Sequence, residues 1–199
     1  MLGWIGRRLA RNLIERAMRT PYSHLQRENG QWYMRRYWLV PYNYIPSFGP
    51  IGCGWVGWDR PIARILQHLD VAIRVHHIME PDMGRHLHDH PWHWISVVLA
   101  GGYEEATPRY QSLECAFFNQ DAEPCHYRWR DTGSVCLRRP GDRHTVARLS
   151  EHGAWTLFIT FKKRQEWGFY TSDGKIHHTE YHGSAHIAPG EDFDVANGA

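Results

Sequence analysis

From Val71 onward the chain consists of short hydrophobic runs separated by turn residues. The run from Trp94 to Leu99 is strongly β-branched and is closed by Gly101-Gly102. Strands about ten residues apart, with Gly-containing turns between them, are typical of a sandwich or jelly roll, so the sequence predicts an all-β domain. The other predicted strands cover residues 71–79, 85–90, 124–130, 134–138, 144–149, 155–162, 166–171 and 175–181.

The first twenty residues follow a helical period instead. Leu2, Ile5, Leu9, Leu13 and Ala17 recur at three-to-four spacing, with arginines around most of the remaining arc. This pattern predicts an N-terminal amphipathic α-helix over about residues 2–19. We expect its apolar stripe to dock on the barrel or on a second subunit, as in a homodimer. A basic amphipathic helix can also lie on an anionic membrane or on nucleic acid.

Charge divides the chain into parts. Residues 1–40 hold eight arginines and two glutamates, which gives +6, so the remainder carries −4 against a formal net charge of +2. We therefore predict a basic helix and aromatic extension over residues 1–60, a β-barrel over 61–185 and a C-terminal tail over 186–199. Within the extension, residues 41–57 are predicted to form a long irregular connection.

Composition narrows the function classes. Ten Trp and ten Tyr suit a barrel lined by large side chains. No apolar run is long enough to span a membrane, and the arginines near the N-terminus interrupt any secretory core. The four cysteines show no C-x-x-C spacing, which predicts reduced thiols and a cytoplasmic location. The near-neutral charge and a single aromatic-basic stretch, residues 31–40, argue against nucleic-acid binding.

Three histidines form the candidate chemistry. On a strand, His88 and His90 point to one face while Asp89 points to the other. His144 follows the turn Pro140-Gly141 at the start of another strand, from where it can supply a third imidazole. Three neutral imidazoles with open positions suit a divalent transition metal. We expect Fe(II) foremost, with Zn, Ni or Mn as the other candidates.

These residues resemble the cupin superfamily. Its first motif is His-x-His, three or four residues, Glu, six residues and Gly, and its second is Pro-x-Gly, two residues and His. The chain matches them with His88, His90, Gly101, Gly141 and His144. Trp94, Arg139 and Arg148 stand in place of the motif Glu, Pro and Asn. The resemblance covers about residues 71–171 and implies a jelly-roll β-barrel, also called a double-stranded β-helix.

The neighbours of the motif leave several roles open. His93 directly precedes the position of the missing Glu, so it is a fourth ligand, a proton shuttle or a turn residue. His86 extends the run to His-x-His-x-His and offers an alternative ligand register. Arg85, Arg138 and Arg148 lie close in sequence to the ligands, and alternation from His144 places Arg148 on their face. We therefore expect Arg148 to neutralise an anionic substrate.

The resulting functional prediction is an Fe(II)-dependent oxygenase that acts on a small anionic organic molecule. A three-His set resembles that of the thiol dioxygenases, which places His88, His90 and His144 on the metal. The alternatives are a metal-dependent isomerase or epimerase, and a non-enzymatic metal-binding or regulatory cupin whose basic N-terminus contacts a partner.

Overall fold

The computed structural model describes residues 4–20, 22–27, 30–40, 60–82, 86–108, 125–171 and 174–181. Its elements in chain order are α1 (Trp4–Ala17), β1 (Tyr22–Gln26), β2 (Trp32–Val40), α2 (Arg60–His68), β3 (Ala72–Ile78), β4 (Trp92–Pro108), β5 (Cys125–Asp131), β6 (Val135–Arg138), β7 (Thr145–Lys163), β8 (Gly168–Thr171) and β9 (Gly174–His177).

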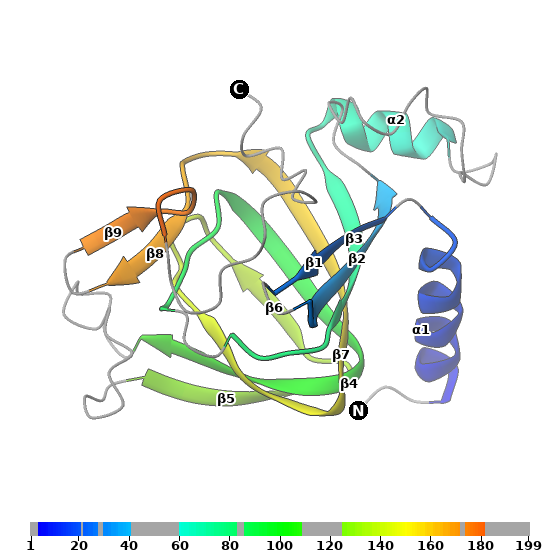
Figure 1. Ribbon diagram of the computed structural model, residues 1–199. Helices are drawn as coiled ribbons and strands as arrows, with labels where there is room; N and C mark the ends of the chain where they lie inside the picture. The colour runs from blue at the N-terminus through cyan, green and yellow to red at the C-terminus, as the bar shows by residue number, and fades with distance from the viewer. Residues whose placement is uncertain are drawn as a thin grey trace.

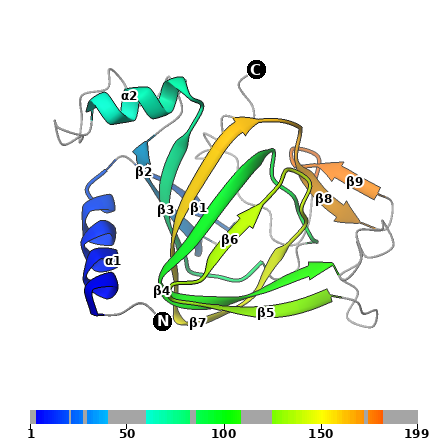
Figure 2. The same ribbon diagram turned by 180° about the vertical axis from the view of Figure 1, so that it is seen from behind.

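Antiparallel strands dominate the described part of the chain (Figure 1). One sheet has the order β1-β2-β3-β7-β4-β5, with β6 paired to the first half of β4, and β8 and β9 form a separate hairpin. The large sheet is strongly curved, so that β4, β5 and β7 wrap around the molecule opposite β1 and β2 (Figure 2). The predicted all-β architecture with an N-terminal helix is confirmed.

Two long bent strands, β4 and β7, run side by side through this curved sheet. They pair antiparallel from Trp92 opposite Lys163 to Ala106 opposite Thr145, with bulges along the way. Gly101 and Gly153 lie where the ladder bends, and both have positive φ, at 71° and 74°. A Cβ added to Gly101 would collide with the carbonyl oxygen of Gly153. Glycine therefore makes the bend possible at these two positions.

The sequence prediction of strand ends at these glycines is wrong. We expected a strand that closed at Gly101-Gly102 and two separate strands over residues 144–149 and 155–162. Instead β4 continues to Pro108, and β7 is one element through Gly153. Glycines with positive φ occur in bulges as well as in turns, so their presence alone does not end a strand.

The helix α1 packs on the outer face of the sheet. Ala10 and Ala17 are buried against Tyr37, Val75 and Leu99, and Leu13 and Ile14 lie beside them. Small alanines allow the helix to approach the strands closely.

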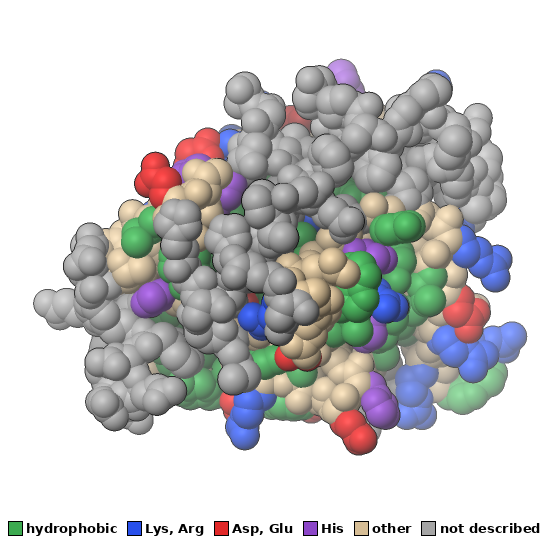
Figure 3. Space-filling view, viewed as in Figure 1, with side chains coloured by type: hydrophobic (Ala, Val, Ile, Leu, Met, Phe, Trp, Pro, Cys, Tyr) green, Lys and Arg blue, Asp and Glu red, His purple; other side chains and the backbone are tan. Residues whose placement is uncertain are grey.

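The opposite edge of this helix lies in solvent. Ile5 and Leu9, which we expected to dock on the barrel or on a second subunit, are 68% and 63% exposed in the single chain. Figure 3 shows basic side chains gathered along this side of the molecule, over α1. The part of the predicted stripe that packs on the barrel is thus the C-terminal part, extended by Ala10 and Ile14.

Substitution of Ile14 tests this packing. Ile14→Ala should lower the free energy of unfolding by about 1–2 kcal/mol, because a partly buried aliphatic side chain loses its contacts with the sheet. Ile5→Ala is the matched control and should change that free energy by less than about 0.5 kcal/mol. Urea unfolding of both variants measures the difference, and equal losses would contradict the packing of α1.

The predicted N-terminal extension contributes strands to the main sheet. Residues of β1 pair with β2, and β2 pairs with β3, so this region continues the barrel sheet by two strands. The predicted connection over 41–57 and the tail over 186–199 lie outside the described residues. Among the helices of the described ranges, none combines the length and apolarity needed to cross a membrane.

Candidate metal centre

Backbone pairing brings the two cupin-like motifs together. His88 and His144 exchange two main-chain hydrogen bonds, with His88 N to His144 O at 3.0 Å and His144 N to His88 O at 2.9 Å. On its other side the His88 segment meets β8, where Tyr170 N donates to Leu87 O at 2.8 Å. Over residues 86–90, the described part of the predicted strand over 85–90, the pairing is reduced to a bridge at His88 between β8 and the start of β7.

Three imidazoles converge at this bridge. Each of His88, His90 and His144 offers a ring nitrogen, and the three nitrogens lie within 4.8 Å of one another. The Nε2 atoms of His90 and His144 are 3.0 Å apart. Two nitrogens bound about 2.1 Å from one metal at right angles would be about 3.0 Å apart, against about 3.4 Å in a tetrahedron. The spacing fits neighbouring positions of an octahedral ion.

The protonation of His90 suits ligation. Burial, followed by the nearby rings of His144 and His88, holds the pKa of His90 well below its usual value. A neutral imidazole keeps the lone pair that a metal requires. The residues present therefore fit a divalent transition metal.

A buried carboxylate stands behind one of these imidazoles. Nδ1 of His144 lies 3.2 Å from Oε1 of Glu105, whose side chain is fully buried. A carboxylate next to Nδ1 favours the tautomer with the proton on that atom, which leaves Nε2 of His144 free to face the metal position. Glu105 is therefore a positioning residue for His144.

Two arginines complete the surroundings of Glu105. Arg130 Nη2 and Arg138 Nη2 lie 2.6 Å and 2.7 Å from its Oε2. Burial would raise the pKa of Glu105, but the contacts with His144 and Arg138 outweigh it and hold that pKa well below its usual range. Arg138, which lies close in sequence to the ligands, thus contacts Glu105 and neutralises its charge.

Asp89, between the two motif histidines, faces away from the metal position as predicted. Its buried carboxylate accepts hydrogen bonds from Gly168 N at 2.9 Å, Tyr170 Oη at 2.9 Å and Lys175 Nζ at 2.7 Å. Gln165 Nε2 donates a further one at 2.8 Å. Asp89 thus ties the β8–β9 hairpin to the segment that carries His88 and His90.

Loss of this charge should loosen the hairpin. Asp89→Asn keeps the side-chain volume but removes the ion pair with Lys175, and we expect a loss of about 1–3 kcal/mol in the free energy of unfolding. Amide hydrogen exchange in β8 and β9 should accelerate more than exchange in β3. Uniform acceleration across all strands would contradict a local anchoring role.

The imidazoles form one wall of a cavity of about 200 Å³. Its other walls are aromatic to a large extent: Trp94 packs edge-on against His90 at 5.4 Å between ring centroids, and Phe158 lies 5.9 Å from it. Trp167 and Phe169 close the side formed by the hairpin. Trp94, which replaces the motif glutamate, therefore forms part of the pocket wall.

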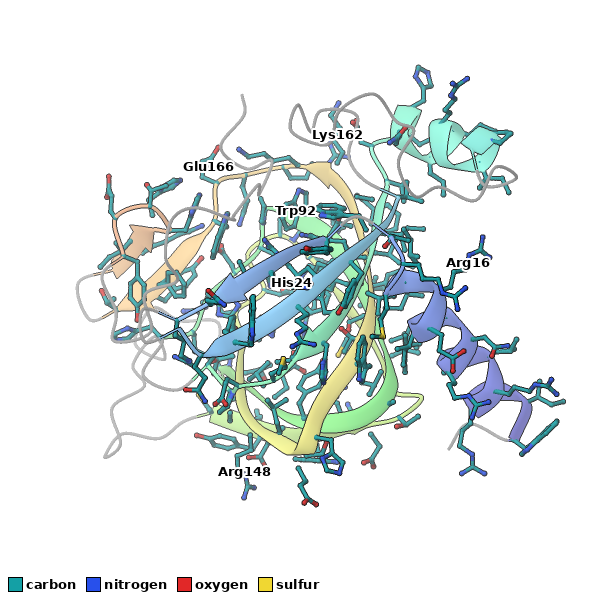
Figure 4. All side chains as sticks on the ribbon, turned by 45° about the vertical axis from the view of Figure 1, so that its right-hand side comes forward. Arg16, His24, Trp92, Arg148, Lys162 and Glu166 are labelled. Carbon is teal, nitrogen blue, oxygen red and sulfur yellow. The ribbon has the colours of Figure 1, made fainter. Side chains whose placement is uncertain are left out.

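Two predicted site residues are not brought to this cavity. His93 is exposed on β4, between the buried Trp92 and Trp94, because alternation turns it to the outer face. The Arg148 side chain is 73% exposed and its Nε lies 2.7 Å from Oε2 of Glu104. Figure 4 shows Arg148 at the outer edge of the barrel, well away from Trp92.

A bulge explains the placement of Arg148. Glu104 pairs with Arg148 but Glu105 pairs with Val146, so β7 has one extra residue at this point. Val146 faces the cavity, and the extra residue turns Arg148 outward. The alternative ligand His86 contacts Tyr181, with its Nδ1 2.9 Å from the hydroxyl, and lies outside the group of three.

Several residues of the site were not found from the sequence. Glu105 had no assignable role, and the cavity also holds Arg36 and Arg74 from the strands before the motifs. A signal for Arg36 existed in the alternation of residues 31–40, which places Met34 and Arg36 on one face of a strand.

No protein-family model and no curated protein matches this chain. Solved structures that it resembles include Fe(II)-HppE with the alternative substrate (S)-1-HPP, at 11% identity over 73% of this chain and 57% of that one, with a TM-score of 0.43. The DMSP lyase DddQ from Ruegeria pomeroyi DSS-3 follows at 15% over 72% and 54%, with a TM-score of 0.40. Recombinant oxalate oxidase in complex with glycolate gives 15% over 52% and 48%, with a TM-score of 0.39.

The chain spans 57%, 54% and 48% of the lengths of these three proteins. Each of the three TM-scores is below 0.5.

Proposed function

We propose that this chain is a metal-dependent enzyme that holds Fe(II) on His88, His90 and His144 and oxygenates a small anionic organic molecule. The observation that carries the proposal is the convergence of three imidazoles on the wall of an internal cavity. When bound, Fe(II) would supply the redox chemistry with O2 that amino-acid side chains do not provide.

The composition of the ligand set supports a divalent transition metal and an anionic substrate. Neutral imidazoles leave the full 2+ charge on the ion, which favours coordination of an anion beside it. His88, His90 and His144 would supply three ligands, which leaves room on a bound ion for a substrate group from the cavity. A cavity of about 200 Å³ lies below the roughly 300–1,000 Å³ that is usual for drug-sized ligands, so the substrate must be small.

The cavity walls beside the three histidines include buried aromatic side chains. Trp94 is 1% exposed and packs against both His90 and His144. Phe169 is 2% exposed and lies over His88. A dry surrounding strengthens the electrostatic attraction between the metal and an anion, and it protects a reactive site from side reactions.

One observation favours an isomerase or epimerase as the second candidate. Asp82 and Tyr33 line the cavity as a hydrogen-bonded pair, and Asp82 also accepts from Val146 N at 2.8 Å. A carboxylate paired with a phenol can exchange a proton with a substrate carbon. Among the described residues, Asp82 is the only one with a carboxylate that lines this cavity.

Oxygen uptake separates the candidates. Protein reconstituted with Fe(II) should consume O2 in an oxygen electrode when screened against small carboxylates and thiols, and Zn-loaded protein should not. His90→Ala should abolish the uptake, while Tyr33→Phe should retain most of it. Turnover that proceeds equally without O2, or with Zn, and that is lost in Tyr33→Phe would favour the isomerase. Full iron occupancy without any turnover would favour a binding protein.

A further inference from the structure

Two arginines lie inside the barrel on the strands that precede the metal-binding motifs. Arg36 on β2 and Arg74 on β3 are 5% and 2% exposed, and both line the cavity that contains the three imidazoles. The antiparallel register places Arg36 opposite His76 and Arg74 opposite Trp38. Because these strands are neighbours, the two guanidinium groups approach the cavity from the same wall.

Shared aromatic neighbours place Arg74 beside the metal ligand His90. The guanidinium of Arg74 lies over Trp92 at 5.5 Å and over Phe158 at 5.3 Å from the ring centroids. The His90 ring lies 6.2 Å from Trp92 and 5.9 Å from Phe158, so the same two rings contact both residues. The cationic group and the metal position therefore lie within the reach of one small molecule.

Stacking also determines how Arg74 can bind. A third ring, Trp38, has its centroid 4.8 Å from the guanidinium carbon. A guanidinium stacked on aromatic faces keeps its N–H groups in its own plane, where they form a fork that matches two oxygens of an anion. The three rings restrict the orientations that this guanidinium can take.

His76 completes the group from the same strand as Arg74. It stacks on Phe158 at 4.9 Å between centroids and lines the cavity. Burial, followed by the charges of Arg74 and Arg36, holds the pKa of His76 well below its usual value. A neutral imidazole between two guanidinium groups can donate a hydrogen bond to an anion without adding a third charge.

We propose that Arg36, Arg74 and His76 form a subsite that binds the oxyanion of the substrate, with the rest of the molecule directed at His88, His90 and His144. This inference rests on the proposed function, because it defines the substrate class of the same cavity. The ligand is a small molecule with a carboxylate or a phosphonate at one end. The subsite takes the role that the sequence assigned to Arg148, and it lies on the inner face of the barrel rather than on its surface.

Calorimetric titration of the full chain loaded with Zn, which permits binding without oxidation, tests the subsite. Acetate and methylphosphonate are the anionic probes, and acetamide is the neutral probe. At least one anion should bind ten times more tightly than acetamide. The anion that binds more tightly shows whether the oxyanion of the substrate is a carboxylate or a phosphonate. Arg74→Gln and Arg36→Gln should each weaken anion binding at least tenfold, and Arg74→Lys should give an intermediate loss because it keeps the charge but not the fork.

Two controls separate this subsite from the metal. Arg128→Gln removes an exposed arginine of β5 and should leave the affinity for the anion unchanged. Without metal, Arg74→Gln should still bind the anion more weakly than wild type, since an anion held by arginines does not require the ion. Equal affinities of wild type and the Arg36 and Arg74 variants, or equal binding of acetamide, would overturn the subsite. Elemental analysis of the same samples reports on the metal centre independently. Normal metal content together with an unchanged anion affinity in the Arg74 variants would overturn the subsite and leave the proposed metal centre standing.

Discussion

Purified protein is expected to carry about one divalent transition metal per chain, and His90→Ala is expected to carry almost none. His90 and His144 present Nε2 atoms 3.0 Å apart, and His88 supplies the third nitrogen of the group. Removal of one of three protein ligands leaves two, which seldom retain a transition metal through purification. Elemental analysis after gel filtration measures the occupancy.

His93→Ala is the informative companion of this experiment. The side chain of His93 is exposed on the outer face of β4, so its loss should leave the metal content unchanged. Loss of metal from His93→Ala, or equal and negligible metal in wild type and His90→Ala, would contradict the assignment of the centre.

Glu105→Gln should have the largest effect on stability among the single substitutions considered. The variant removes the negative charge beside the buried Arg130 and the partly buried Arg138, and breaking a buried pair costs about 3–5 kcal/mol. It also removes the negative charge next to Nδ1 of His144, and we expect the affinity for metal to fall about 10–100-fold. Thermal unfolding and competitive metal titration measure the two effects.

The neighbouring glutamate provides a matched control. Glu104 also pairs with an arginine, but its partner Arg148 is 73% exposed and lies on the surface. Glu104→Gln should therefore change neither the melting temperature nor the metal affinity appreciably, because exposed ion pairs stabilise little. Equal losses in the two variants would indicate that the general negative charge of β4 matters and that the position of Glu105 does not.

Much of the fold could be predicted because many of its strands follow from local sequence patterns. Alternation of polar and apolar residues located β3, β5 and β6 and the β8–β9 hairpin within a few residues. The continuous β4 and β7 were missed because a glycine that bends a strand and a glycine that ends one look alike in the sequence. The same limitation affected Arg148: one bulge in β7 turns this side chain away from the face that Val146 shares with the ligands.

The site divides in a similar way. His88, His90 and His144 were found from spacing, because an i, i+2 pair on a strand and a histidine after a turn are local signals. Glu105 and its partner Arg130 are 25 residues apart, and no spacing rule connects them. Arg36 and Arg74 reach the cavity only through the pairing of β2 with β3, which the sequence does not specify.

The bent ladder of β4 and β7 has a consequence for the order of folding. His88 and His90 precede the start of β4, while His144 precedes the start of β7, and in an antiparallel ladder these two starts lie at opposite ends. The imidazoles meet only after the ladder has curled and its ends have closed on one another through the bridge of His88 with His144. A chain that has formed its hairpins but not this closure has no complete metal site. Metal binding is therefore linked to the closure of this ladder, and an ion held by the three imidazoles would stabilise the closed state over every open one.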